Sequence, residues 1–313
     1  MVMRKQNKKA IEMGFNWLFA IIAGAVILFI AIYATSKIIG TGTQYTQTES
    51  AARLSNLLSE AGIASGKSNI IEFSKETRTY YGCDIESDFG RNTIAFSEKL
   101  FNKWSEKGGE ITVNNKYIFA NEVEEGELYV SSQPFFMPFK VADLIFISTD
   151  KYCFVEPPND IESDISNLDN VKLIDSSEDC EGIRVCFTMG YSSTANCNIT
   201  VIGDDVEFSR GTVKKNGKGM YYTDGLLYGA IFSNEKIYEC NVKRLMKKFN
   251  ELAEIYDEKM NIIQCGENLK SELLIMKNDA NNLDSSSDLQ SLAMLAKSID
   301  QKNKGNCNVY MSQ

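Results

Sequence analysis

The sequence contains no histidine among its 313 residues. A chain without histidine lacks the commonest general base near neutral pH, the Ser-His and Cys-His nucleophile pairs, and any zinc site built on imidazole. It also lacks a C-x-x-C pair, the spacing typical of zinc ribbons and thioredoxin-like redox sites. We therefore predict no catalytic, cofactor-binding or metal-ligating residues, and we do not expect an enzyme.

A long charge-free run lies near the N-terminus, from Phe15 to Thr35. It has the length that a helix needs to cross a hydrocarbon core, about 20 residues, and it exceeds the apolar core of a cleaved secretory signal, about 7–15 residues. Residues 1–13 carry four cations and one anion. The positive-inside bias predicts that this leader is cytoplasmic and that the rest of the chain is extracytoplasmic at the cell membrane, anchored in lipid by the helix.

The remainder of the chain is acidic. The formal net charge is −9 and the leader contributes +3, so the residues after the leader carry −12. Such a domain repels phosphate backbones, so we do not expect nucleic acid as a partner. Ala20 and Gly24 form a small-x-x-x-small pair that would let two membrane helices approach, which leaves self-association open beside an ordinary lipid-facing helix. No protein partner is specified.

One stretch, Ala61–Ser68, matches A-x-x-x-x-G-K-S and raises the question of a phosphate-binding loop. Such a loop follows a strand and opens a helix. Here the order is reversed, because Ala51, Leu54 and Leu58 form a helical stripe before it, and β-branched and aromatic residues follow it. We interpret the stretch as a helix end and predict that Lys67 binds no nucleotide.

Eight cysteines occur in the segment that we place outside the cytoplasm, and an even number there favours disulfides. We predict a cross-strand bridge within a hairpin, a bridge that ties the C-terminal helices, a bridge that flanks a β-α-β unit, and a bridge between the remaining two cysteines. In that order the pairs are Cys186 with Cys197, Cys265 with Cys307, Cys153 with Cys180, and Cys83 with Cys240.

From Asn69 to Tyr222 the sequence consists mainly of short β-branched or aromatic segments separated by Gly, Asn, Asp or Pro, a pattern typical of strands. Between two of them, Pro157 and Pro158 can open a helix whose Ile161 and Ile165 share a face, which predicts one β-α-β unit inside an otherwise antiparallel set. The predicted strands are IIEFSK, TRTYYGC, NTIAFSE, KYIFAN, ELYVSS, ADLIFIS, YCFV, VKLID, IRVCF, NITVI and DVEFS.

The C-terminal part changes period. Apolar residues recur at steps of three and four from Val242 to Ile263 and again from Leu289 to Ile299, which predicts helices. Asn234 and either Asp284 or Ser285 are the predicted N-caps. We interpret the stripes as core faces, so this part should form a helical hairpin or a three-helix segment.

Three weaker features concern contacts and modification. The stretch SQPFFMPFKVADL, Ser132–Leu144, is rich enough in aromatics to form a contact patch, but we interpret it as buried core. Asn198 begins an N-I-T sequon and is a candidate glycosylation site. Adjacent acids could bind calcium, although no D-x-D-x-D-G loop is present and solvated turns are the commoner case. These pairs are Glu124 and Glu125, Glu178 and Asp179, and Asp204 and Asp205.

The sequence KKAIEMGFNWLFAIIAGAVILFIAIYATSKI resembles the N-terminus of type IV pilin-like proteins. The resemblance implies a candidate processing site between Gly14 and Phe15, and a hydrophobic helix that packs into a filament core. Phe19 stands at the fifth mature position, where that family usually carries glutamate. The chain also resembles uncharacterised archaeal single-pass membrane proteins that share ETRTYYGC, PFKVADLIF and YGAIFSNEKIYECNVKRLM, and this second resemblance implies no activity.

These features predict an α+β protein in which a transmembrane helix continues into an amphipathic helix. We expect a membrane-anchored cell-surface structural or contact protein with a disulfide-stapled domain. The alternatives are a pilin-like filament subunit and an extracytoplasmic hydrolase that uses carboxylates. Because glutamate is replaced by Phe19, we expect the mature chain to begin at or near Met1. The predicted parts are the leader (1–13), the transmembrane helix (14–39), the amphipathic helix (40–66), a β-rich extracytoplasmic domain (67–232) and a C-terminal helical segment (233–313).

Overall fold

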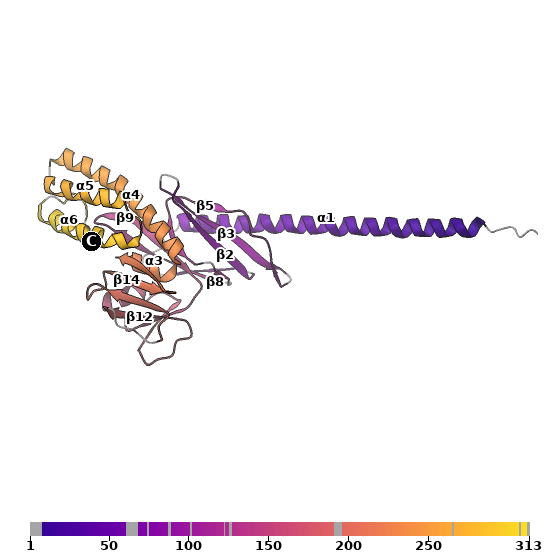
Figure 1. Cartoon of the computed structure of the whole chain (residues 1–313), viewed down its shortest axis with the longest axis horizontal. Helices are drawn as coiled ribbons and strands as arrows, with labels where there is room; N and C mark the ends of the chain where they lie inside the picture. The colour runs from indigo at the N-terminus through magenta and orange to yellow at the C-terminus, as the bar shows by residue number, and fades with distance from the viewer. Residues whose placement is uncertain are drawn as a thin grey trace, which may run out of the picture.

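The computed structural model describes residues 8–60, 68–73, 75–86, 89–100, 102–121, 123–124, 127–190, 196–264, 266–306 and 308–311. Its first helix, α1 (Lys8–Glu60), has 53 residues and projects from the folded part of the chain (Figure 1). Within the described residues, Trp17–Lys37 is the one stretch long and apolar enough to cross a membrane, and none of it is buried. Ala51, Leu54 and Leu58, near the other end, are buried. The apolar stretch that we predicted to cross the membrane and the predicted amphipathic helix are therefore parts of one continuous helix.

Three β-sheets form the middle of the chain, and the first of them packs against α1. This anchor sheet consists of β2 (Thr77–Asp84), β3 (Arg91–Leu100), β4 (Lys103–Trp104), β5 (Ile111–Val113) and β7 (Val123–Glu124), in the order β4-β3-β2-β7 with β5 paired to β3. The central sheet consists of β1 (Asn69–Glu72), β6 (Tyr117–Ala120), β8 (Glu127–Phe136) and β9 (Lys140–Ser148), in the order β1-β8-β9-β6.

The third sheet has six strands. These are β10 (Tyr152–Val155), β11 (Val171–Ile174), β12 (Ile183–Met189), β13 (Ile199–Gly203), β14 (Arg210–Lys215) and β15 (Lys218–Thr223), in the order β11-β10-β12-β13-β14-β15. Helix α2 (Asn159–Ile165) connects the parallel strands β10 and β11, and its Ile161 and Ile165 are buried, so the predicted β-α-β unit is confirmed.

The central sheet separates two hydrophobic cores. Side chains alternate along a strand, so Ile145 and Ile147 of β9 face one core while Leu144 and Phe146 face the other. The smaller core holds the buried end of α1 and the anchor sheet. The larger core holds one face of the six-stranded sheet and the C-terminal helices. The anchor side and the helical side of the molecule therefore have separate cores.

The chain ends in helices that lie on the side of the molecule away from the apolar part of α1 (Figure 1). They are α3 (Leu226–Phe232), α4 (Glu235–Ile263), α5 (Glu267–Asn281), the short 3-10 helix η1 (Ser286–Asp288) and α6 (Leu289–Asn306). Asn234 is the N-cap of α4, and its side chain accepts from Ile237 N at 3.0 Å. Ser285 begins η1 with a reciprocal capping box. Asn234 is confirmed as a cap, Ser285 caps the 3-10 helix that leads directly into α6, and three α-helices follow Asn234 in the described part of the chain.

Lys215 closes the C-terminal end of α3, all of whose residues are buried. Its ammonium donates to the carbonyl oxygens of Ile231 at 2.8 Å and Ser233 at 3.0 Å. Carbonyls at a helix end have no partner within the helix, and a cation there also meets the negative end of the dipole. Burial lowers the pKa of Lys215 to about 8, with the charge of Asp150 opposing the shift.

The predicted hairpin between β12 and β13 is wrong, because these strands are parallel and Cys186 lies opposite Thr200. The sheet is also not antiparallel around the β-α-β unit, since β10 and β12 are parallel as well, and so are β6 and β9 in the central sheet. The chain returns from β12 to β13 through nine residues, 190–198, more than a tight hairpin needs. Strand period alone does not distinguish the two directions.

The segment DVEFS, Asp205–Ser209, was predicted as a strand and is a turn instead. Asp205 Oδ1 accepts from Ser209 N at 2.9 Å, and Phe208 has a φ of 51°, so the aspartate holds a turn that resembles a strand in its alternation of polar and apolar residues. The stretch SQPFFMPFKVADL is core as predicted, since Phe135, Met137 and Phe139 are buried.

Candidate functional site

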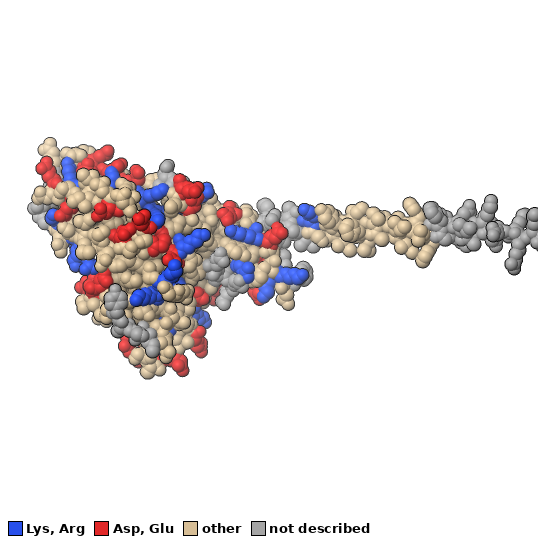
Figure 2. Space-filling model, viewed as in Figure 1, with Lys and Arg blue, Asp and Glu red and all other residues tan. Residues whose placement is uncertain are grey.

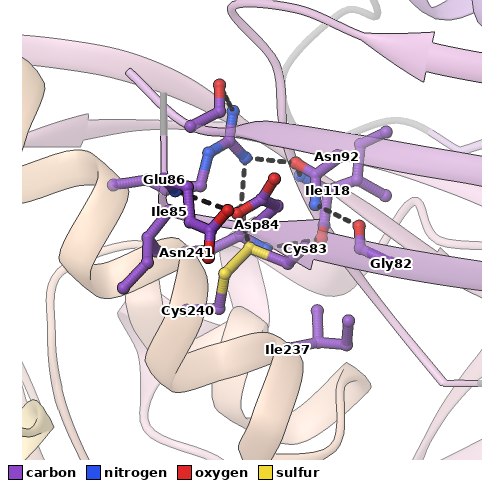
Figure 3. Close-up of a disulfide and its surroundings, with 12 residues drawn as sticks. Gly82, Cys83, Asp84, Ile85, Glu86, Asn92, Ile118, Ile237, Cys240 and Asn241 are labelled. Carbon is purple, nitrogen blue, oxygen red and sulfur yellow. Dashed lines mark hydrogen bonds between the residues drawn. A yellow bond between two sulfur atoms is a disulfide. The ribbon is translucent and has the colours of Figure 1, made fainter. Parts of the chain in front are cut away.

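A junction between the anchor sheet and the C-terminal helices is built around the disulfide Cys83–Cys240 (Figure 3). Cys83 lies in β2 and Cys240 in α4, so the bond joins residues that are 157 positions apart in sequence. The predicted pairing of these two cysteines is confirmed. It links the side of the molecule that holds α1 to the side that holds α4.

Arg244 lies beside this disulfide and is fully buried. Its guanidinium donates to the carbonyl oxygen of Phe89 at 3.0 Å, to Asn241 Oδ1 at 2.7 Å and to Asn92 Oδ1. It also lies 4.8 Å from the centre of the Tyr117 ring. Desolvation lowers the pKa of Arg244 to about 10, opposed by Tyr117 and Asp84. The side chain is therefore a buried cation whose bonds go to neutral oxygens of three different elements.

The two asparagines of the junction also cap the free edge of β6. Ile118 N donates to Asn92 Oδ1 at 3.1 Å, and Asn241 Nδ2 donates to the carbonyl oxygen of Ile118 at 2.7 Å. Asn92 Nδ2 in turn donates to the carbonyl oxygen of Gly82 at 3.1 Å. Buried backbone groups at a sheet edge need such partners. Figure 3 shows both amides next to the disulfide, between the strands and α4.

A second covalent region covers the outer face of the six-stranded sheet. Two disulfides, Cys153–Cys180 and Cys186–Cys197, form a small core there with Val155 and Ile174. The connections from β11 to β12 and from β12 to β13 have eight and nine residues, fewer than the dozen or so that a helical crossover needs. The two disulfides therefore supply the small core on a face of the sheet where these connections are too short to place a crossover helix.

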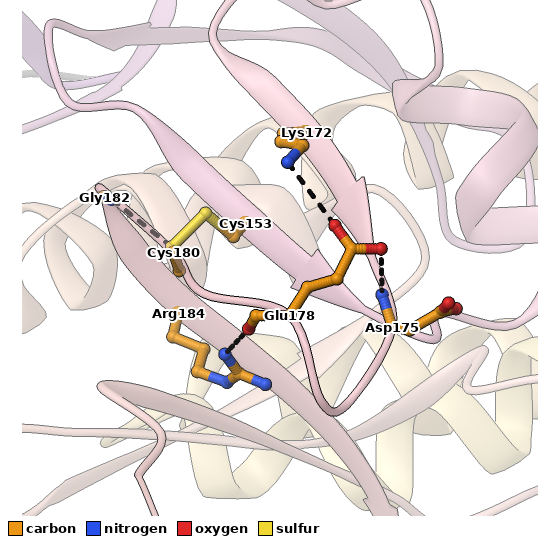
Figure 4. A network of polar contacts seen from close by, with 7 residues as sticks. All are labelled: Cys153, Lys172, Asp175, Glu178, Cys180, Gly182 and Arg184. Carbon is orange, nitrogen blue, oxygen red and sulfur yellow. Dashed lines mark hydrogen bonds and ion pairs between the residues drawn. A yellow bond between two sulfur atoms is a disulfide. The ribbon is translucent and has the colours of Figure 1, made fainter.

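Polar contacts hold the first of these connections in place (Figure 4). The Arg184 guanidinium donates to the carbonyl oxygens of Glu178 at 2.8 Å and Ser176 at 2.7 Å. The Glu178 carboxylate lies 3.5 Å from the Lys172 ammonium and accepts from Asp175 N. Glu178 therefore has a structural role in a loop that Cys180 also ties down.

Asn198 is exposed at the start of β13. Its Oδ1 accepts from Arg184 N at 2.8 Å, and the amide nitrogen, to which a glycan would attach, takes no part in this bond. The geometry is compatible with the sequon, and glycosylation stays a prediction.

A groove of about 660 Å³ lies between α4 and α5, at the end of the molecule away from the apolar part of α1 (Figure 1). Its floor contains the buried Ala253 and Leu273, and Leu274 at its rim is 59% exposed. Figure 2 shows acidic and basic side chains beside one another over this end. The charged residues that line the groove are Glu254, Asp257, Glu258, Glu267, Lys270 and Lys277.

Some of the predicted residues are outside the described part of the chain, and others lie away from the junction and the groove. Cys265, Cys307 and residues 61–67, which include Lys67, are outside the described residues, although the order of α1 followed by β1 is the helix-then-strand order that we predicted. Gly14 and Phe15 lie within α1, and processing there stays a prediction. Asp204 accepts from the Tyr221 hydroxyl, and Asp205 holds its turn. Among the described residues, no three His, Cys, Asp or Glu side chains are placed to hold a metal ion.

Sequence reasoning identified the paired cysteines but missed Arg244, its two asparagines and the groove. Comparisons with protein-family models, with curated proteins and with solved structures each find no match to this chain. Its function therefore has to be inferred from its own geometry.

Proposed function

We propose that the chain is a membrane-anchored protein that holds a disulfide-stapled α+β domain at the outer cell surface, where the domain makes structural or binding contacts. The observation that carries the proposal is the continuity of α1. One helix supplies 21 mostly apolar residues, Trp17–Lys37, none of them buried, and then packs Ala51, Leu54 and Leu58 into the core of the domain. Lipid would cover the exposed part, since a helix satisfies its own backbone groups there.

The disulfides support an extracytoplasmic position. Three bonds with S–S distances of 1.87 to 2.04 Å join six of the cysteines, and none of the described cysteines is free. Disulfides persist in oxidising compartments and are rare where thiol systems keep the cytosol reducing. With the cationic leader inside, the domain after α1 would lie outside.

A filament subunit is the second candidate, because the same helix favours it. In the pilin-like resemblance, a long N-terminal helix would pack its apolar half against neighbouring copies. The exposed apolar part of α1 would be covered equally well by such copies as by lipid. We prefer the anchor because Phe19 replaces the glutamate that the resemblance implies.

The proposed role is binding or support, not catalysis. The chain has no histidine, and the groove carboxylates Glu254 and Glu258 are exposed on one helix instead of facing each other across a closed cleft. A hydrolase would show turnover of glycoside or ester substrates that Glu258→Gln abolishes.

Protease accessibility and N-terminal sequencing test the proposal together. Protease added to intact cells should digest the chain after Thr43 and spare Arg4 to Lys9, and the native protein should begin at or near Met1 and stay with membranes after shearing. A mature N-terminus at Phe15 in sheared filaments would establish the filament subunit instead. Protection of the C-terminal helices in intact cells would contradict the orientation.

A further inference from the structure

The groove between α4 and α5 carries negative charge that the chain itself does not neutralise. Its two lysines already have partners, since Lys277 pairs with Glu254 and Lys270 donates to Asn261 Oδ1. Within the part of the chain that the structure describes, Asp257, Glu258 and Glu267 form no hydrogen bond or ion pair. A ligand that enters the groove therefore meets three free carboxylates and no free ammonium.

The shape of the groove suits a helix. Its walls are two consecutive helices, joined by residues 264–266, that pack along each other. On α5 the lining residues run from Glu267 to Lys277, ten positions or about 15 Å of helix. Leu274 is 59% exposed and lines the groove together with the buried Ala253 and Leu273, so an apolar side chain of a third helix would meet Leu274 between charged side chains.

Other occupants fit these observations less well. A second copy that docked through the same groove would place carboxylates against carboxylates, because the two groove lysines of each copy already have partners. A metal ion would need a cluster of ligands, and no such group exists among the described side chains. We propose that the groove binds a cationic amphipathic helix of a partner protein, with leucine-like residues on Leu274 and lysine or arginine residues beside Asp257, Glu258 and Glu267. This inference rests on the proposed contact function and names its partner class.

The test uses the full chain in nanodiscs of zwitterionic phosphatidylcholine, because a cationic helix also binds anionic lipid. The probe is a fluorescent 14-residue peptide with leucines at positions i, i+3, i+7 and i+10 and lysines at flanking positions. A second peptide has the same composition in an order without helical period. Fluorescence anisotropy should show saturable binding of the first peptide only, and the affinity should fall as salt rises.

Matched variants locate the binding. Glu258→Gln with Glu267→Gln should weaken binding by about tenfold, since two of the three free carboxylates beside the bound helix are neutralised. Asp160→Asn with Glu162→Gln removes two exposed charges from α2 and should leave binding unchanged. Leu274→Ala should weaken binding by about threefold through lost apolar contact. Circular dichroism would verify that each variant is folded.

Three results would overturn the inference: absence of saturable binding at millimolar peptide, equal binding of the peptide without helical period, and equal losses in the α2 and groove variants. The result is separate from the proposed function, because peptide binding in nanodiscs does not depend on which side of a cell membrane the domain lies. Peptide binding with the opposite topology would reject only the surface role. Correct topology without binding would reject only the partner class.

Discussion

The two disulfide-bonded regions differ in the range over which they act. On the outer face of the six-stranded sheet, Cys153–Cys180 and Cys186–Cys197 span 27 and 11 residues and cover strands whose connections are short. At the junction, Cys83–Cys240 spans 157 residues and lies beside the buried Arg244, whose guanidinium donates to the Phe89 carbonyl oxygen and to two asparagine side chains. On the outer face of the sheet, two disulfides form the small core under short connections. At the junction, one disulfide holds together two parts of the molecule that have separate cores.

The chain-entropy account makes this difference quantitative. A cross-link removes more freedom from the unfolded chain when its loop is longer, and the three loops correspond to about 5, 3.5 and 3 kcal/mol at 25 °C, in the order Cys83–Cys240, Cys153–Cys180 and Cys186–Cys197. The ranking should therefore follow sequence separation, and five predictions test or extend it.

The largest effect is expected from Cys83→Ser with Cys240→Ser, which should lower the free energy of unfolding by about 5 kcal/mol. Urea titration of the full chain in nanodiscs would measure it, with the fluorescence of Trp104 in β4 reporting on the anchor sheet. The variant should also separate the unfolding of the anchor sheet from that of α4. A loss no larger than that of the local disulfides would show that loop length does not set the ranking.

The local disulfides should give smaller losses, about 3.5 kcal/mol for Cys153→Ser with Cys180→Ser and about 3 kcal/mol for Cys186→Ser with Cys197→Ser. Hydrogen exchange should quicken in β10 to β13 and stay unchanged in β2, because these bonds constrain only the outer face of one sheet. Faster exchange in β2 would mean that the two regions are coupled.

Arg244→Gln tests the polar half of the junction and should cost about 3 kcal/mol, because the carbonyl oxygen of Phe89 and Asn241 Oδ1 lose the guanidinium donor and Asn92 Oδ1 keeps only Ile118 N. Arg184→Gln is the matched control in the other region. It also removes two hydrogen bonds to carbonyl oxygens, but near the surface, so about 1 kcal/mol is expected. Similar losses for the two variants would argue against a special role for the buried cation.

Alkaline pH should produce the smallest of these effects. Burial raises the pKa of Tyr117 to about 12 from its ordinary value near 10. Between pH 10 and pH 12 the folded state therefore keeps a proton that the unfolded state releases. The contribution of Tyr117 to the free energy of unfolding is complete below pH 10 and falls as the pH rises toward 12. Tyr117 alone accounts for about 1.4 kcal/mol at pH 11. Urea titrations at pH 9 and pH 11 would measure the loss, and Tyr117→Phe should reduce it.

Lys215, in the six-stranded sheet, acts in the opposite direction. Its folded pKa, about 8, lies below the ordinary value of 10.5, so the folded state disfavours the charge. That penalty is full below pH 8 and is relieved as pH rises toward 10.5. Lys215→Met should therefore flatten the stability profile between pH 8 and pH 10. An unchanged profile in that window would place the titration elsewhere.

Local features of the fold could be predicted because they depend on near neighbours. Asn234 caps α4 through its own side chain, and Ile161 and Ile165 face the core because a helix brings positions four apart together. Strand direction could not be predicted, since alternation is the same in parallel and antiparallel pairs. The predicted pairing of Cys186 with Cys197 is confirmed, although these cysteines do not lie in the hairpin from which we predicted it, because β12 and β13 are parallel.

Arg244 illustrates why the candidate sites were missed. It lies on the side of α4 opposite the buried Val242, and Ile262, 18 residues later, shares that side. Near Arg244 the anchor sheet covers this face, whereas Ile262 is 81% exposed. The spacing of apolar residues along α4 does not show how far along the helix the anchor sheet reaches. The groove depends in the same way on how two helices meet, which their separate stripes do not specify.

The unbroken backbone of α1 fixes the orientation of the domain relative to the apolar part of the helix. Each residue of a helix adds a turn of 100° and a rise of about 1.5 Å, and no break separates the apolar part from Ala51. Inserting a single residue between Lys37 and Gln47 would therefore rotate the whole domain by about 100° around the helix axis and lift it by about 1.5 Å. The direction in which the groove between α4 and α5 faces is therefore set by the rotational phase of α1.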